Sequence, residues 1–138
     1  MGDLLLRKAL QIRDRIGKVR AALPAQAEAV LDDERLEAFL SFQLFLLIQD
    51  AVDLASHLVA ARGLGVPGSQ REVFDLLARA GLLAVDTARG MGGMIALRNR
   101  IAHAYGDLDP VRMVQEAPAG LARLEALLDE LAGVVASA

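Results

Sequence analysis

One segment in the second half of this sequence carries polar side chains whose types suit work on a phosphate group. The run LRNRIAHAYGDLDP, residues 97–110, contains Arg98, Asn99, His103 and Tyr105. A planar, permanently charged guanidinium can hold two phosphate oxygens at once. An imidazole that titrates near neutral pH can transfer a proton. The segment therefore predicts a site that binds phosphate and moves protons, with Asn99 and Arg100 as supporting phosphate ligands.

The position of Arg98 on its helix is the strongest physical anomaly in the chain. On a wheel that advances about 100° per residue, Arg98 lies in the centre of an apolar stripe. A guanidinium buried there costs free energy unless it is paired or opens into a polar cavity. The apolar residues of the stripe are Met91, Met94, Ile95, Leu97 and Ile101.

A second strip of the same helix carries Asn99 and His103 together with two small residues, Gly92 and Ala96. The small residues leave room for a close neighbour or for a cleft. Tyr105 returns to the stripe of Arg98 near the end of the helix. One guanidinium, one amide, one imidazole and one phenol thus surround one helix end.

Spacing alone favours a structural interpretation of the same residues. An inward arginine is often a tie to a buried carboxylate, and Asp50 and Asp53 on a preceding helix are candidate partners. A histidine near a helix C-terminus often only compensates the helix dipole. With two histidines and no cysteine in the chain, a metal site is not predicted, and no cofactor is expected.

Hydrophobic periodicity predicts the helices that must position this segment. The first helix, residues 4–23, has its apolar side at Leu6, Leu10, Ile16, Val19 and Leu23, and it carries a basic surplus. A long helix follows from about residue 32 to 62, where Phe42 and Phe45 widen the apolar surface and favour burial on two sides. Ser69 and Glu72 predict a capped short helix that ends at Gly81. Two more helices are expected at about 83–104 and 111–135, the last bent or divided at Pro118.

Composition sets the class of protein. The 138 residues are 54% hydrophobic and 4% aromatic, with a net charge of −3. We expect an all-α, antiparallel four- to five-helix bundle that occupies residues 1–138 as a single domain. The negative charge argues against tight nucleic-acid packaging but allows a brief contact at a local basic site. The apolar stretch at 38–48 is too short for a membrane span of about 20 residues, so no membrane contact and a cytoplasmic location are expected.

The run around Arg98 resembles the signature of the HepT-like proteins of the HEPN superfamily. The matching features are Arg98-Asn99, His103 and Tyr105, the DLASH run at 53–57, the Gly-rich approach at 90–93 and the start of the last helix at Asp109-Pro110. The resemblance covers nearly the whole chain, and no residue inside the motif departs from the pattern.

This resemblance implies a helical homodimer that acts as the toxin of a toxin–antitoxin pair, a metal-independent endoribonuclease with RNA, including transfer RNA, as its transient substrate. Its partner would be a small nucleotidyltransferase, an MntA-like antitoxin, that transfers AMP to the motif tyrosine. By position, Arg98 and His103 would be catalytic and Tyr105 modified, while Asn99 would orient His103 or bind phosphate.

The wheel adds a geometric condition to this hypothesis. Arg98 and His103 lie about 140° apart, so one ideal helix cannot aim both at one point. Either the helix end distorts or two subunits share a cleft.

Two other functions stay open: a non-catalytic HEPN subunit that presents nucleotide or substrate to the nucleotidyltransferase, and a purely structural helical dimer.

Overall fold

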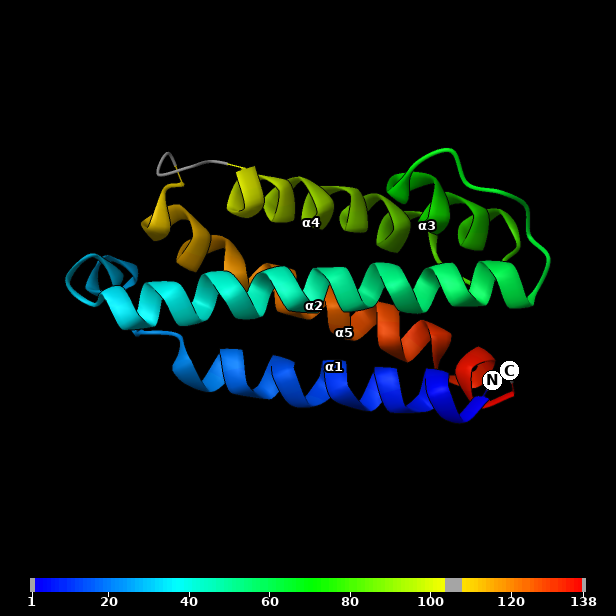
Figure 1. Ribbon diagram of the computed structural model, residues 1–138, viewed down its shortest axis with the longest axis horizontal. Helices are drawn as coiled ribbons and strands as arrows, with labels where there is room; N and C mark the ends of the chain where they lie inside the picture. Colours follow the sequence, from blue (N-terminus) through cyan, green and yellow to red (C-terminus); the bar gives the residue numbers. More distant parts are fainter. Residues whose placement is uncertain (1, 104–107, 138) are drawn as a thin grey trace.

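The computed structural model describes residues 2–103 and 108–137, and every regular element within these ranges is a helix. Successive long helices run in alternate directions, and α2 lies in the centre, with α1 along one side and α3 and α4 along the other (Figure 1). This confirms the predicted all-α antiparallel bundle. The elements are α1 (Gly2–Ala22), the 3-10 helix η1 (Ala27–Asp32), α2 (Glu34–Ala61), α3 (Gln70–Arg79), α4 (Val85–His103) and α5 (Pro110–Ser137).

Local capping signals place several helix boundaries. The Ser69 hydroxyl accepts a hydrogen bond from the Glu72 amide at 3.2 Å, which confirms the predicted start of α3. α3 ends at Arg79, and Gly81, two residues further on, has a φ of 75°, a left-handed conformation that favours glycine. The Leu82 amide then donates to the Leu77 carbonyl at 3.0 Å, which satisfies one of the open carbonyls of the last turn.

Side-chain hydrogen bonds also define the N-termini of α4, which carries the motif, and of α5, which follows it. The Glu130 carboxylate of α5 accepts a hydrogen bond from the Ala84 amide at 2.7 Å, just before α4 begins. Asp109 accepts from the Arg112 amide at 3.2 Å and caps α5. α5 then continues through Pro118 as one helix, so the predicted division there is wrong.

The core confirms most of the predicted apolar faces, but that of the first helix only in part. Leu121, Leu124 and Leu128 of α5 are buried as expected. In α1, however, Leu6 and Leu10 are 47% and 57% exposed. The face that α1 turns toward α2 and α5 buries Ile16 and Val19 as predicted, with Leu5 and Ile12 in place of Leu6 and Leu10.

The central helix α2 is long and apolar enough to cross a membrane by length and composition, although half of its most apolar window is buried inside the protein. α2 contacts α1, α3, α4 and α5, and it contributes ten buried residues. The central helix of a bundle has this same apolar character, because neighbours cover it on more than one side.

Gly120 of α5 leaves room for the close approach of the Met94 side chain of α4. A Cβ atom at this position would lie 3.0 Å from the Sδ and Cε atoms of Met94, which is itself buried. We expect Gly120→Val to lower the free energy of unfolding by about 1–3 kcal/mol through overpacking. Chemical denaturation would measure this change. Gly133→Val on the same helix is the control, because nothing lies within 4 Å of that position; equal losses in both variants would contradict the close approach.

Candidate functional site

Arg98 lies at the interface of α4 with α2, as its place on the apolar stripe predicts. The residue is 9% exposed and is the one buried charged residue among those described. Its Nη1 donates to the Gln49 side-chain oxygen of α2 at 2.9 Å, and its Nη2 donates to the Asn99 side-chain oxygen at 2.9 Å. Both acceptors are neutral amides, so these hydrogen bonds orient the guanidinium without cancelling its charge.

The expected carboxylate partners do not pair with this arginine. Neither Asp50 nor Asp53 has an oxygen within 4.0 Å of the Arg98 guanidinium, in the part of the chain that the structure describes. Burial raises the pKa of the Asp50 carboxyl above its usual range, and the charges of Arg15 and Lys8 on α1 oppose this shift. The basic residues that act on the Asp50 carboxyl therefore lie on α1, not on α4. The prediction that a carboxylate of α2 pairs with Arg98 is wrong.

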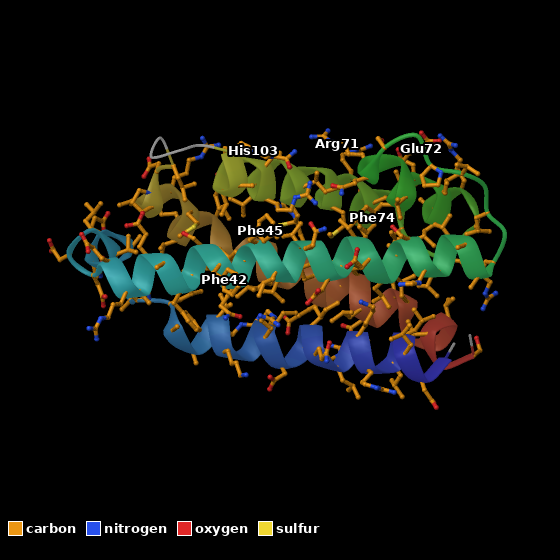
Figure 2. All side chains as sticks on the ribbon, viewed as in Figure 1. Phe42, Phe45, Arg71, Glu72, Phe74 and His103 are labelled. Carbon is orange, nitrogen blue, oxygen red and sulfur yellow. The ribbon has the colours of Figure 1, made fainter. Side chains whose placement is uncertain are left out.

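Asn99 and His103 lie on the exposed side of α4, one helical turn apart. His103 is the last residue of the helix, at the end that lies farthest from α3 (Figure 2). The hydrogen bond from Arg98 to Asn99 connects the buried guanidinium to this exposed strip. The described geometry thus brings Arg98 and Asn99 together directly and places His103 beyond Asn99 on the same face.

Arg100 makes a different contact from the one predicted for it. Its Nη2 donates to the Glu116 carboxylate of α5 at 2.7 Å, and Arg112 binds the other oxygen of Glu116 at 2.8 Å. Glu116 therefore offsets the charge of Arg100 and ties α4 to α5. A phosphate-binding role for Arg100 stays a prediction.

Tyr105, the predicted modification site, lies outside the described residues. Among the residues that are described, no group of three or more His, Cys, Asp or Glu side chains is placed to hold a metal ion.

Gln49 is the site residue that sequence analysis missed. It follows the apolar run FLLI at 45–48, where its amide marks only the end of that run. The separation of 49 positions between Gln49 and Arg98 is bridged by the packing of α2 against α4. The single available signal is that a polar residue on a largely buried helix requires a hydrogen-bond partner.

Comparison with known families decides the assignment. The family described as "Ribonuclease HepT-like" matches residues 12–131, most of the chain. The chain belongs to this HepT-like family. The resemblance that its motif suggests is therefore confirmed at the level of the family.

Individual relatives support the same assignment. This HepT-like chain is 26% identical over 109 residues to the mRNA nuclease HepT of Shewanella oneidensis, covering 79% of this chain and 81% of that protein. It also superposes on the structure of a tri-AMPylated HEPN toxin of Shewanella oneidensis in complex with MNT antitoxin, with a TM-score of 0.87 and 24% sequence identity. The match covers 96% of this chain and 99% of that toxin chain.

A more distant structural neighbour has the same fold. YutE of Bacillus subtilis, described as a cytosolic protein of unknown function, gives a TM-score of 0.73 at 17% identity. The match covers 92% of this chain and 90% of YutE. Together, the structural matches confirm the HEPN-like helical fold.

Proposed function

We propose that this protein is the toxin of a toxin–antitoxin pair, an endoribonuclease that cleaves RNA without a metal ion at a site built from Arg98 and His103. Membership in the HepT-like family supports the class of activity. The observation that carries the proposal for this chain is the buried Arg98, whose two described hydrogen-bond partners are both neutral amides. A buried cation that is oriented but not neutralised suits an incoming anion.

The residues have complementary roles in the proposed reaction. The 2′-hydroxyl of RNA attacks the adjacent phosphorus and gives its proton to the His103 imidazole, while negative charge builds on the phosphate oxygens beside Arg98. The bond from phosphorus to the 5′-oxygen breaks, and that oxygen takes up a proton. The products are a 2′,3′-cyclic phosphate and a 5′-hydroxyl. Asn99, which accepts a hydrogen bond from Arg98, keeps the guanidinium directed toward the exposed strip.

We propose that two subunits share the site. α4 stays helical through His103, so its described part offers no distortion that would bring the imidazole round to Arg98. Residues 98 and 103 thus keep their separation of about 140° around the helix axis. A second copy of the chain can supply the missing group across a common cleft.

The surface beside Arg98 suits such a homodimer. On α2, Phe42 is 59% exposed and Phe39 is 38% exposed. Phe42, Phe45 and Gln49 recur at helical spacing, so the exposed apolar surface leads toward the residue that holds Arg98. Large aromatic side chains are typical of the buried centre of protein interfaces. A dimer through this face of α2 would cover the aromatic side chains and bring two motifs together.

The proposed regulation is transfer of AMP to Tyr105 by an MNT-type nucleotidyltransferase antitoxin. The tri-AMPylated toxin in complex with MNT antitoxin, whose fold this chain shares, supports this partner. The added group would be bulky and anionic, and it would exclude RNA from the cleft by volume and by charge.

We further propose that the protein is cytoplasmic and that residues 1–138 form one domain, as the sequence predicts.

Co-expression with a nucleotidyltransferase encoded beside this protein tests the regulatory proposal. We expect intact-mass spectrometry to find the wild-type chain heavier by at least one AMP. Tyr105→Phe should abolish the first addition, because AMP needs the phenol oxygen as its acceptor. An unchanged mass of the wild-type chain, or full modification of Tyr105→Phe, would contradict the assignment of Tyr105.

A non-catalytic subunit that presents nucleotide or substrate to the nucleotidyltransferase is the alternative function. It predicts a protein that dimerises and binds its partner but cuts no RNA. Incubation of the purified protein with total RNA and with transfer RNA in EDTA separates the two. Cleavage that is lost in His103→Ala while the dimer persists supports the enzyme, and absence of cleavage by wild type supports the alternative.

A further inference from the structure

The basic residues of this chain differ in whether a carboxylate offsets them. Three of the six basic residues of α1 have a carboxylate partner: Arg13 pairs with Asp129 at 2.6 Å, Lys18 pairs with Asp14 at 3.1 Å, and Arg20 pairs with Glu125. The hydrogen bond from Arg20 lowers the pKa of the Glu125 carboxyl, which keeps that partner ionised. The basic surplus that the sequence predicts for the first helix is therefore offset in part by carboxylates.

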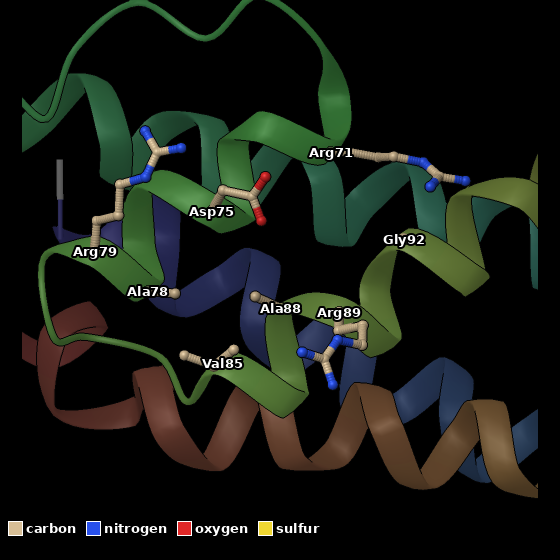
Figure 3. Close-up of a pocket in the computed structure, with 8 residues that line it drawn as sticks. All are labelled: Arg71, Asp75, Ala78, Arg79, Val85, Ala88, Arg89 and Gly92. Atoms are coloured by element: carbon tan, nitrogen blue, oxygen red, sulfur yellow. The ribbon is translucent and has the colours of Figure 1, made fainter.

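A groove between α3 and α4 shows the opposite balance. It has a volume of about 470 Å³ and is lined by Arg71, Arg79 and Arg89 with Asp75 as its one carboxylate (Figure 3). Within the described residues, neither Arg71 nor Arg79 has a carboxylate oxygen within 4.0 Å, and Arg89 has only the exposed Asp86 at 3.5 Å. The groove therefore carries a local positive charge on a chain of net charge −3.

Arg71 connects this groove to the motif along one face of α4. Its side chain extends from α3 over α4 at Gly92 (Figure 3), where an added Cβ atom would lie 3.7 Å from its Nη1. Gly92 and Asn99 are seven residues apart, which places them on the same helix face and about 10 Å apart along the axis. Between them Ala96 is the small, half-buried residue of that face, so an extended ligand can lie close to the helix backbone.

We propose that the α3–α4 groove binds the phosphodiester backbone of single-stranded RNA on one side of the scissile bond. Arg71 and Arg79 are the main residues that contact the phosphates. This inference rests on the proposed function, because it extends the RNA path away from Arg98 and His103. Arginine suits phosphate because its planar fork donates two parallel hydrogen bonds. None of the described residues that line the groove is aromatic, so the groove binds the backbone without stacking bases and reads little sequence.

The groove reaches α4 at Gly92, on the helix face that carries Asn99, and this alignment with the motif favours RNA over an acidic protein as its occupant. An extended polyanion can contact cations that are spread over two helices, from Arg79 and Arg71 on α3 to the Arg98–Asn99 pair on α4. The groove between α4 and α5 is less suited to this role, because Glu116 there already binds Arg100 and Arg112.

Binding measurements on a catalytically inactive protein test the groove directly. In a His103→Ala background, we expect the double change Arg71→Gln and Arg79→Gln to weaken binding of a labelled single-stranded RNA by about tenfold at low salt. The slope of log affinity against log salt should fall by about 1.4, since each phosphate contact on a single strand contributes about 0.7. Arg13→Gln with Arg20→Gln on the opposite side of the bundle is the matched control and should change affinity less than twofold.

Steady-state cleavage with an active His103 gives a second readout. The groove variant should raise KM for a long oligonucleotide and leave kcat unchanged, and it should cut a dinucleotide too short to reach Arg71 as well as wild type does. Unchanged RNA affinity in the groove variant overturns the proposal, as does a loss confined to binding of the nucleotidyltransferase. RNA that binds through the groove of a wild-type protein but is never cut supports the groove and contradicts the proposed nuclease function.

Discussion

Replacing His103 with alanine is expected to slow RNA cleavage in EDTA by about 10²–10⁴-fold, the range that a general acid or base contributes. The imidazole lies at the exposed end of α4, next to the strip to which Arg98 is linked through Asn99. Exposed substitutions usually change stability by less than about 0.5 kcal/mol, so the melting temperature and the dimer should be retained. Initial rates on a defined RNA measure the effect.

His57→Ala is the matched control for this prediction. His57 is the other histidine in the chain, and it lies on α2, within a run that the HepT-like resemblance includes but outside the Arg98–His103 motif. We expect its cleavage rate to stay within about twofold of wild type, well below the general acid–base range. A His103→Ala protein that cleaves at the wild-type rate would remove the imidazole from the mechanism, whatever the behaviour of His57→Ala.

Mixing two inactive variants is expected to restore activity if two subunits share the site. Arg98→Gln, which keeps a side-chain amide near Gln49, and His103→Ala should each be inactive alone. Subunit exchange at equal concentrations gives about one half heterodimers, in which one of the two composite sites has both wild-type groups. We expect about a quarter of the wild-type cleavage rate after the two proteins are unfolded and refolded together.

The same mixture gives a clear negative result for the alternative geometry. If each subunit supplies its own Arg98 and His103, every site in a heterodimer lacks one group, and activity stays at the level of the single variants. Size-exclusion chromatography with light scattering controls for assembly, because the comparison requires that both variants form dimers. A persistent dimer with no recovery would contradict the shared cleft.

Local signals in the sequence predict the helix boundaries well, because caps act over three or four residues. Ser69 with Glu72 and Asp109 with Pro110 start their helices where expected. The orientation of α1 is less determined, since LLL at residues 4–6 offers several apolar faces of similar quality. Packing against α2 and α5 selects the face with Leu5 and Ile12 and leaves Leu6 and Leu10 exposed.

Contacts between helices were the part of the site that sequence could not provide. The periodicity of α4 predicts that Arg98 points inward, and its 9% exposure confirms this. Which residue of α2 meets the guanidinium depends on the rotation and translation of one helix against the other. Gln49 rather than Asp50 is in register, a difference of one residue that turns the side chain by about 100°. The approach of Arg71 to Gly92 depends on packing in the same way.

The chemistry of the product ends is the sharpest test of metal-independent cleavage through the 2′-hydroxyl. Purified wild-type protein would be incubated in EDTA with a defined RNA and with a copy that has a single 2′-deoxy substitution at the mapped cut position. We expect cleavage of the all-ribose strand to a 2′,3′-cyclic phosphate and a 5′-hydroxyl, and no cleavage at the deoxy position. Efficient cleavage at the deoxy position, or cleavage of the all-ribose strand only after a divalent metal is added, would contradict it.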